Sequence, residues 1–79
     1  MDARVLNVSP LKNYQLEITF TDKTKGIFDC SKYLQYGIFK ELKDEKYFKQ
    51  VKVSDGTVAW SHGQDFCSDT LLSEAKFLK

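Results

Sequence analysis

Apolar and polar side chains alternate through YQLEITF, residues 14–20. A period of two, in a run rich in aromatic and β-branched residues, predicts a strand with one buried face. Residues 4–9 are predicted to form an earlier strand, which Pro10 ends. A turn at residues 21–23 leads to a third predicted strand at residues 25–28. Three strands with short connections predict an antiparallel meander.

Turn and cap residues predict short helices in residues 31–48. Ser31 can cap a short helix that continues to Tyr36, with Gly37 at the left-handed position that ends it. Asp44 can cap one further turn over residues 45–48. We therefore expect short helices after the meander.

A hairpin and a helix are predicted for the rest of the chain. Asp55-Gly56 separates two β-rich runs, FKQVKV and TVAW, and this dipeptide is a strong hairpin signal. The segment DTLLSEAKFL repeats apolar residues at helical spacing, with Ser68 or Asp69 near its start and lysines at its end. This spacing predicts a C-terminal helix.

The chain has 79 residues, which suits one domain, residues 1–79, with a small core. The order of its elements predicts an α+β fold, an antiparallel sheet of about five strands with helices on one face. The side chains expected in the core are those that strand alternation and helical spacing place on the buried face of their segments. They are Tyr14, Leu16, Ile18, Phe20, Val51, Val53, Trp60, Leu71, Leu72 and Ala75.

A serine, a histidine and an aspartate occur close together in WSHGQDF, residues 60–66, and His62 is the single histidine of the chain. In known triads the three residues come from separate parts of the chain, whereas Ser61, His62 and Asp65 share one short connection. We interpret His62, Gly63 and Asp65 as a structural turn, with Gly63 at positive φ in a region that His62 also tolerates. We predict no catalytic residue; a binding role of the turn is the alternative.

The two cysteines, Cys30 and Cys67, lie far apart without a Cys-x-x-Cys or histidine pattern. A zinc site needs three or four ligands at recognisable spacing, so we expect neither a metal nor another cofactor. In a reducing compartment both residues are expected to be free thiols that behave as small buried hydrophobic side chains. A reactive thiol at Cys67 is the alternative, since a position just before a helix lowers a thiol pKa.

Charge and hydropathy limit the classes of partner. No stretch is apolar enough to span a bilayer and the N-terminus has no apolar signal segment, so we expect a cytoplasmic protein without membrane contact. The 12 basic residues are balanced by 11 acidic ones, which disfavours binding to phosphate backbones. Nucleic acid is nevertheless the alternative partner, through the Lys-rich segment 40–52 with Tyr47 and Phe48 interleaved.

Several patterns along the chain are similar to those of one known family. The strand at residues 14–20 is followed by an acidic turn and Phe28-Asp29. The most specific part is Trp60-x-x-Gly63-x-Asp65-Phe66-x-x-Asp69-Thr70-Leu71. Further matching positions are Leu34, Gly37-Ile38-Phe39, Leu42, Phe48 and Val51-x-Val53. With these residues, nearly the whole chain resembles the domain of unknown function 2442 family of small prokaryotic proteins.

The chain departs from the family pattern at four positions. Ser61 and His62 stand where the family typically has Pro and Asn, which implies that His62 fills a slot suited to a left-handed residue and is no general base. Ser68 replaces a proline at the start of the last helix. Lys23 stands where a turn glycine is usual, so the resemblance implies a less tight turn there.

The resemblance implies an α+β domain without an established activity, and relatives are often proposed to act with another small protein, in toxin–antitoxin style pairs or as regulators. Our leading hypothesis is a protein-interaction or regulatory module, not an enzyme, that binds another small protein or a second copy of itself. Tyr33 and Tyr36 are the candidate contact residues, because a helix of barely two turns can direct only one face inward.

Overall fold

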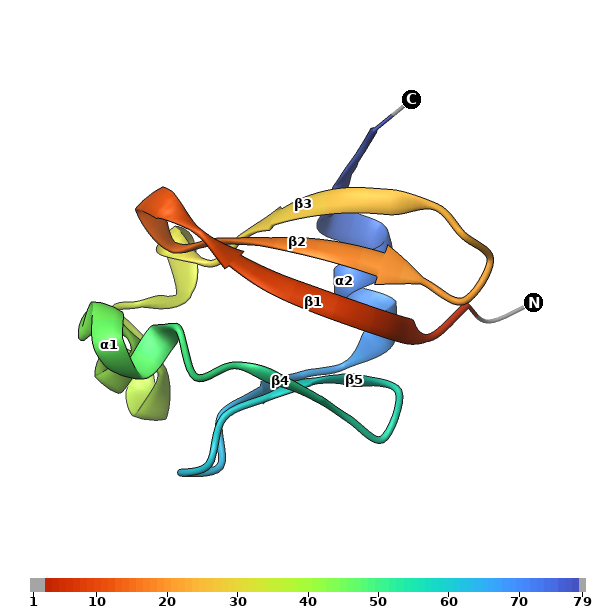
Figure 1. Ribbon diagram of the computed structural model, residues 1–79. Helices are drawn as coiled ribbons and strands as arrows, with labels where there is room; N and C mark the ends of the chain where they lie inside the picture. Colours follow the sequence, from red (N-terminus) through yellow and green to blue (C-terminus); the bar gives the residue numbers. More distant parts are fainter. Residues whose placement is uncertain (1–2, 79) are drawn as a thin grey trace.

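Two antiparallel sheets and several short helices form the fold in a computed structural model, which describes residues 3–78 (Figure 1). With η denoting a 3₁₀ helix, the elements are β1 (Val5–Leu11), η1 (Lys12–Tyr14), β2 (Gln15–Phe20), β3 (Lys25–Asp29), η2 (Ser31–Tyr33), η3 (Gly37–Lys43), α1 (Glu45–Phe48), β4 (Lys52–Ser54), β5 (Thr57–Ala59), β6 (Asp65–Phe66), α2 (Ser68–Glu74) and β7 (Lys76–Phe77). The strand orders are β1-β2-β3-β7 and β4-β5-β6.

The N-terminal meander agrees with the prediction from alternation. β2 pairs antiparallel with β1 and β3, and its Leu16, Ile18 and Phe20 are fully buried. The expectation that Pro10 ends the first strand is wrong, because Pro10 pairs with Leu16 and β1 continues to Leu11. β1 is an edge strand, where a residue without an N–H is tolerated since one side of the strand makes no ladder bonds.

The C-terminal helix is shorter than its apolar spacing predicts. α2 ends at Glu74, and Ala75 takes an extended conformation with φ −68° and ψ 142°. The chain then forms β7, in which Phe77 pairs with Gly26 of β3. A Cβ atom on Gly26 would lie 3.1 Å from the Cβ of Ala75, so glycine permits this close approach. The prediction of a helix through Leu78 is therefore wrong.

The predicted single sheet of about five strands is also wrong in detail, since residues 3–78 contain seven strands in two sheets. The Asp55-Gly56 hairpin is confirmed, with φ of 50° and 78° at the two turn residues. β6 adds an unpredicted third strand beside β5.

In Figure 1 the hairpin lies below the meander, α2 extends between the two levels, and α1 lies at the end where β1 turns into β2. Within residues 3–78 no helix is long and apolar enough to cross a membrane.

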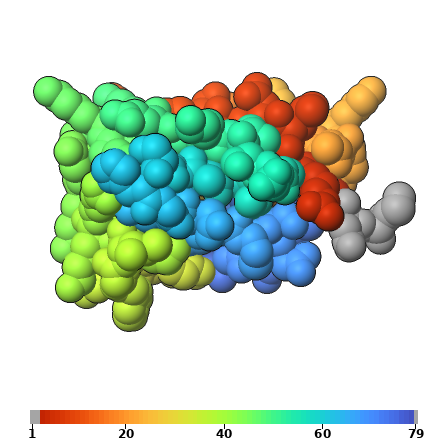
Figure 2. All heavy atoms as spheres, turned by 90° about the horizontal axis from the view of Figure 1, so that it is seen from below, coloured from red at the N-terminus to blue at the C-terminus, as the bar shows by residue number. Residues whose placement is uncertain are grey.

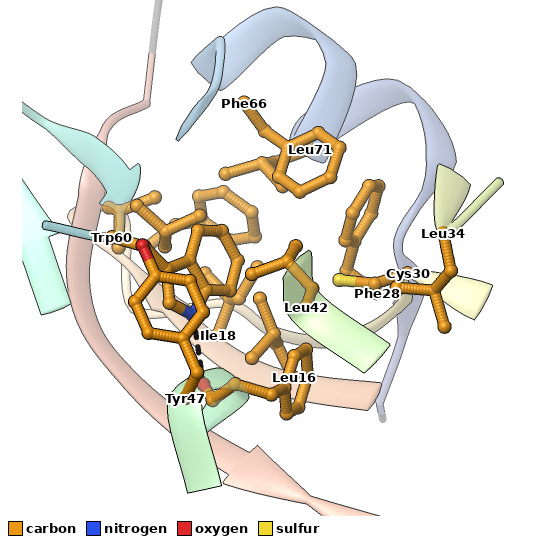
Figure 3. Packing of buried hydrophobic residues seen from close by; sticks show 14 residues of the cluster. Leu16, Ile18, Phe28, Cys30, Leu34, Leu42, Tyr47, Trp60, Phe66 and Leu71 are labelled. Atoms are coloured by element: carbon orange, nitrogen blue, oxygen red, sulfur yellow. Dashed lines mark hydrogen bonds between the residues drawn. The ribbon is translucent and has the colours of Figure 1, made fainter. Parts of the chain in front are cut away.

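The core lies between the two sheets, and aromatic side chains fill much of it (Figure 3). Its buried apolar members are Val5, Leu16, Ile18, Phe20, Phe28, Cys30, Leu34, Leu42, Tyr47, Phe48, Val58, Trp60, Phe66 and Leu71. Tyr14, Val51, Leu72 and Ala75 pack against this cluster and are half-buried. Val53 is 38% exposed, contrary to prediction, because it lies on β4, an edge strand of the smaller sheet.

Candidate functional site

The segment from Trp60 to Phe66 reverses the chain between β5 and β6. The N–H of Gly63 donates to the Trp60 carbonyl at 3.2 Å, and the N–H of Trp60 donates to the Gln64 carbonyl at 2.9 Å. Gly63 has φ of 102°, a conformation that favours glycine. His62 has no positive φ, so the expectation that it fills a left-handed position is wrong. The side chain of His62 instead contacts η3 and α1.

The imidazole of His62 is held on two sides, although 59% of the side chain is exposed. Its Nδ1 lies 2.6 Å from Oε2 of Glu41, which is in η3. Its ring is stacked on Tyr47, which is in α1, with centroids 4.8 Å apart. The backbone N–H of His62 also donates to the Tyr47 hydroxyl at 2.9 Å. The position and orientation of this surface ring are therefore fixed.

Gln64 connects the same residues from below the surface. It is 1% exposed, and its Nε2 donates to Oε1 of Glu41 at 3.0 Å and to the Ile38 carbonyl at 2.9 Å. Its Oε1 accepts from the Tyr47 hydroxyl at 2.6 Å. A buried amide whose polar atoms are all paired stabilises one arrangement, because any other would leave a buried group without a partner. Glu41, Tyr47, His62 and Gln64 thus form one polar network.

Glu41 supplies the one carboxyl group of this network. The hydrogen bond from Gln64 and, next, that from His62 lower the pKa of the Glu41 carboxyl from its ordinary value of 4.5. A carboxylate on Nδ1 with Nε2 left free is the base half of a hydrolytic triad. Within residues 3–78, however, no hydrogen bond joins the imidazole to a serine or cysteine. The arrangement can orient an imidazole for contact with another molecule.

The structure separates the residues that WSHGQDF places side by side. Asp65 lies in β6 with its side chain exposed, and Glu41, not Asp65, is the acidic partner of His62. Sequence reasoning missed Glu41, Tyr47 and Gln64, which are 21, 15 and 2 positions from His62. No spacing pattern links them. The one signal was the presence of a glutamine in a segment expected to form a tight turn, and it does not identify a partner.

The two candidate contact tyrosines have different environments. The Tyr33 ring is half-buried and packs against Phe28 and Phe66, with centroids 6.0 and 5.1 Å away. Its hydroxyl donates to the Glu74 carboxylate at 2.7 Å, so it is not free for a partner. Tyr36 is 66% exposed. The predicted helix through Tyr36 is shorter, since η2 ends at Tyr33, while Gly37 has the expected left-handed φ of 48°.

Within the described residues, the cysteines form no metal site and the Lys-rich segment 40–52 forms no base-stacking site. Cys30 is buried, as expected, but Cys67 is exposed, so its expected burial is wrong. Within the described part of the chain, no three His, Cys, Asp or Glu residues are grouped to hold a metal ion. In the Lys-rich segment, Tyr47 and Phe48 are 7% and 2% exposed and offer no ring face for base stacking.

Comparison with known proteins places the chain in a family. No curated protein and no solved structure matches it. The sequence model of the family described as "Protein of unknown function (DUF2442)" matches residues 5–77, which is nearly the full length of the chain. The chain therefore belongs to the DUF2442 family.

Proposed function

We propose that this chain is a protein-interaction module that binds another small protein or a second copy of itself. The contact surface, here called the η3 surface, consists of Tyr36, Ile38, Glu41 and His62. The observation that carries the proposal is the exposure of two large side chains, 66% for Tyr36 and 58% for Ile38, beside the fixed polar network. Aromatic side chains in such positions are frequent anchors of protein interfaces.

Three members of the η3 surface, Ile38, Glu41 and His62, are adjacent for geometric reasons, and Tyr36 is the residue that directly precedes η3. Side chains three residues apart on a 3₁₀ helix lie above one another, so Ile38 and Glu41 share one side of η3. His62 contacts Glu41 from the neighbouring turn. Figure 2 shows this turn, in light blue, lying against the yellow-green atoms of η3. An apolar pair with a polar border has the composition of an interface core and rim.

The polar network supports binding by holding this surface in one conformation. Gln64 joins the Ile38 carbonyl to Glu41, and Tyr47 fixes both Gln64 and His62. A surface that is ordered before binding loses less conformational entropy when a partner arrives. The proposal includes no catalytic step, because within residues 3–78 no hydrogen bond joins the His62 imidazole to a serine or cysteine.

Two measurements test this function. Sedimentation equilibrium of the pure protein tests self-association, and affinity capture from the native host with mass spectrometry identifies a different partner. Tyr36→Ser and Ile38→Ser should each weaken the measured association about tenfold or more, because each removes a central apolar contact. Leu6→Ser is the matched control, since Leu6 is 60% exposed but lies on β1 outside the η3 surface.

Comparison of Leu6→Ser with Tyr36→Ser shows whether the η3 surface is the interface. Association that Leu6→Ser weakens as much as Tyr36→Ser would place the interface elsewhere. A chain that remains a monomer, and whose captured proteins bind the Tyr36→Ser variant equally well, would contradict the proposal. Circular dichroism of each variant should show an unchanged fold, because these three side chains are exposed.

A further inference from the structure

A hollow of about 350 Å³ lies between the β1–β2 connection and α1, away from the η3 surface. Figure 1 shows both elements at the same end of the molecule. The residues that line the hollow are Pro10, Leu11, Lys12, Tyr14, Glu45, Phe48 and Lys49. Its volume is at the lower end of the range of about 300 to 1,000 Å³ that small-molecule sites occupy.

The inner wall of the hollow is apolar and firmly held. Tyr14 and Phe48 meet edge to face, with ring centroids 5.4 Å apart and planes inclined by 76°. The Tyr14 hydroxyl donates to the Lys43 carbonyl at 2.5 Å, and its own carbonyl accepts from the N–H of Cys30 at 2.9 Å. Phe48 is 2% exposed and belongs to the core. A ligand would therefore find this wall already formed.

The backbone at the rim has an unusual conformation. Asn13 and Tyr14 have φ of 60° and 59°, in the left-handed region that residues other than glycine seldom adopt. The two hydrogen bonds of Tyr14 hold this turn against the end of η3 and the start of η2. The shape of the hollow thus depends on contacts between segments that are distant in sequence.

The charged side chains at the rim determine which ligand charge the hollow favours. Lys12 and Lys49 are exposed, and within residues 3–78 neither forms an ion pair with a carboxylate. Glu45 lies at the same rim, so the three side chains sum to one positive charge. One net positive charge suits a single carboxylate and disfavours a polyphosphate, whose several negative charges Glu45 would repel.

We propose that this hollow binds a small organic monocarboxylate with an aromatic or similarly flat apolar body. The body packs against Tyr14, Pro10 and Leu11, and the carboxylate lies at the rim near the ammonium groups of Lys12 and Lys49. This site is separate from the proposed protein-interaction surface. α1 lies between them, with Phe48 lining the hollow and Tyr47 contacting His62.

Titration with phenylacetate, followed by ¹H–¹⁵N NMR, tests this proposal on the full chain. The backbone amides of residues 11–14 and 48–49 should shift, with a dissociation constant on the order of 1 mM for so small a ligand. Phenethylamine carries the same ring with a positive charge, and phenylacetamide carries it without charge. Phenylacetate should bind at least about tenfold more tightly than phenethylamine.

A pair of double variants separates the charge at the hollow from the charge of the whole protein. Lys12→Gln with Lys49→Gln should weaken phenylacetate binding about tenfold. Lys40→Gln with Lys52→Gln changes the net charge equally at exposed positions outside the lining and should leave binding unchanged. Equal affinity for the amine, shifts spread over the whole chain, or equal losses in both double variants would overturn the proposal.

Discussion

The imidazole of His62 lies against the ring of Tyr47, with ring centroids 4.8 Å apart and ring planes inclined by 22°. Tyr47 is 7% exposed, so this contact joins a surface residue directly to the core. The same tyrosine donates its hydroxyl hydrogen to Gln64 and accepts a hydrogen bond from the His62 N–H. The surface that we propose for protein binding is therefore supported by a buried side chain of α1.

Tyr47→Phe should lower the free energy of unfolding by about 1–3 kcal/mol. The change removes one hydroxyl and leaves the buried Oε1 of Gln64 without its donor. Tyr36→Phe is the matched control, because the exposed Tyr36 should change stability by no more than about 0.5 kcal/mol. Urea denaturation followed by circular dichroism measures both values. Equal, small losses in the two variants would show that the network contributes little to stability.

Glu41→Gln should reduce the acid sensitivity of the fold. Because hydrogen bonds from Gln64 and then His62 lower the pKa of Glu41 in the folded state, the folded protein binds this proton less readily than the unfolded chain. The resulting stabilisation is complete above the ordinary value of 4.5 and is lost as the pH falls through the lower folded-state pKa.

The measurement for Glu41 is the urea midpoint at a series of pH values from about 6 to about 3. The wild-type midpoint should fall more steeply below pH 4.5 than that of Glu41→Gln. Glu17→Gln, on β2, is the control, since Glu17 forms no ion pair within residues 3–78. Parallel curves for wild type and Glu41→Gln would contradict this explanation.

Lys23→Gly should stabilise the turn between β2 and β3. Lys23 has φ of 73°, where an L residue loses about 1–2 kcal/mol of conformational energy and glycine loses none. The greater entropy of glycine in the unfolded chain offsets part of this gain, so we expect a net increase of up to about 1 kcal/mol. Lys25→Gly, inside β3, should instead destabilise by about 0.5–1 kcal/mol. A similar loss in both variants would exclude strain at Lys23.

Leu71→Ala should reduce the free energy of unfolding by about 2–5 kcal/mol, because Leu71 is fully buried against the core. Leu72→Ala is the neighbouring control on α2, where the side chain is half-buried and its removal leaves less of a cavity. Thermal denaturation of both variants gives the comparison. A midpoint that Leu71→Ala leaves unchanged would be incompatible with the packing described above.

The two thiols should react at very different rates. Burial raises the pKa of Cys30, while a hydrogen bond with the Thr70 hydroxyl, 3.1 Å from Sγ, lowers that of the exposed Cys67. Iodoacetamide at neutral pH should therefore modify Cys67 alone until the protein unfolds. Thr70→Val should slow the reaction. Mass spectrometry of the intact, non-reduced chain should find two free thiols and no zinc adduct, and rapid modification of Cys30 would contradict its burial.

Local patterns in the sequence predicted the parts of the fold that local chemistry determines. Alternation in residues 14–20 identified β2, because a half-buried strand requires that period. Asp55-Gly56 identified the hairpin, since both turn residues need positive φ. Asp44 caps α1 by accepting from the N–H of Lys46. Each of these features is decided by residues only a few positions apart.

Tertiary contacts decided the remaining features. Residues 76–77 form a strand and not a helix end, because Gly26 leaves room beside β3 for the chain to pair there. Glu41 and Gln64 meet His62 because η3, α1 and the turn pack together around Tyr47. Alternation and helical periodicity describe how a segment divides its own side chains between two faces. They carry no information about which distant segment provides the hydrogen-bond partner, since that depends on how the buried aromatic side chains pack.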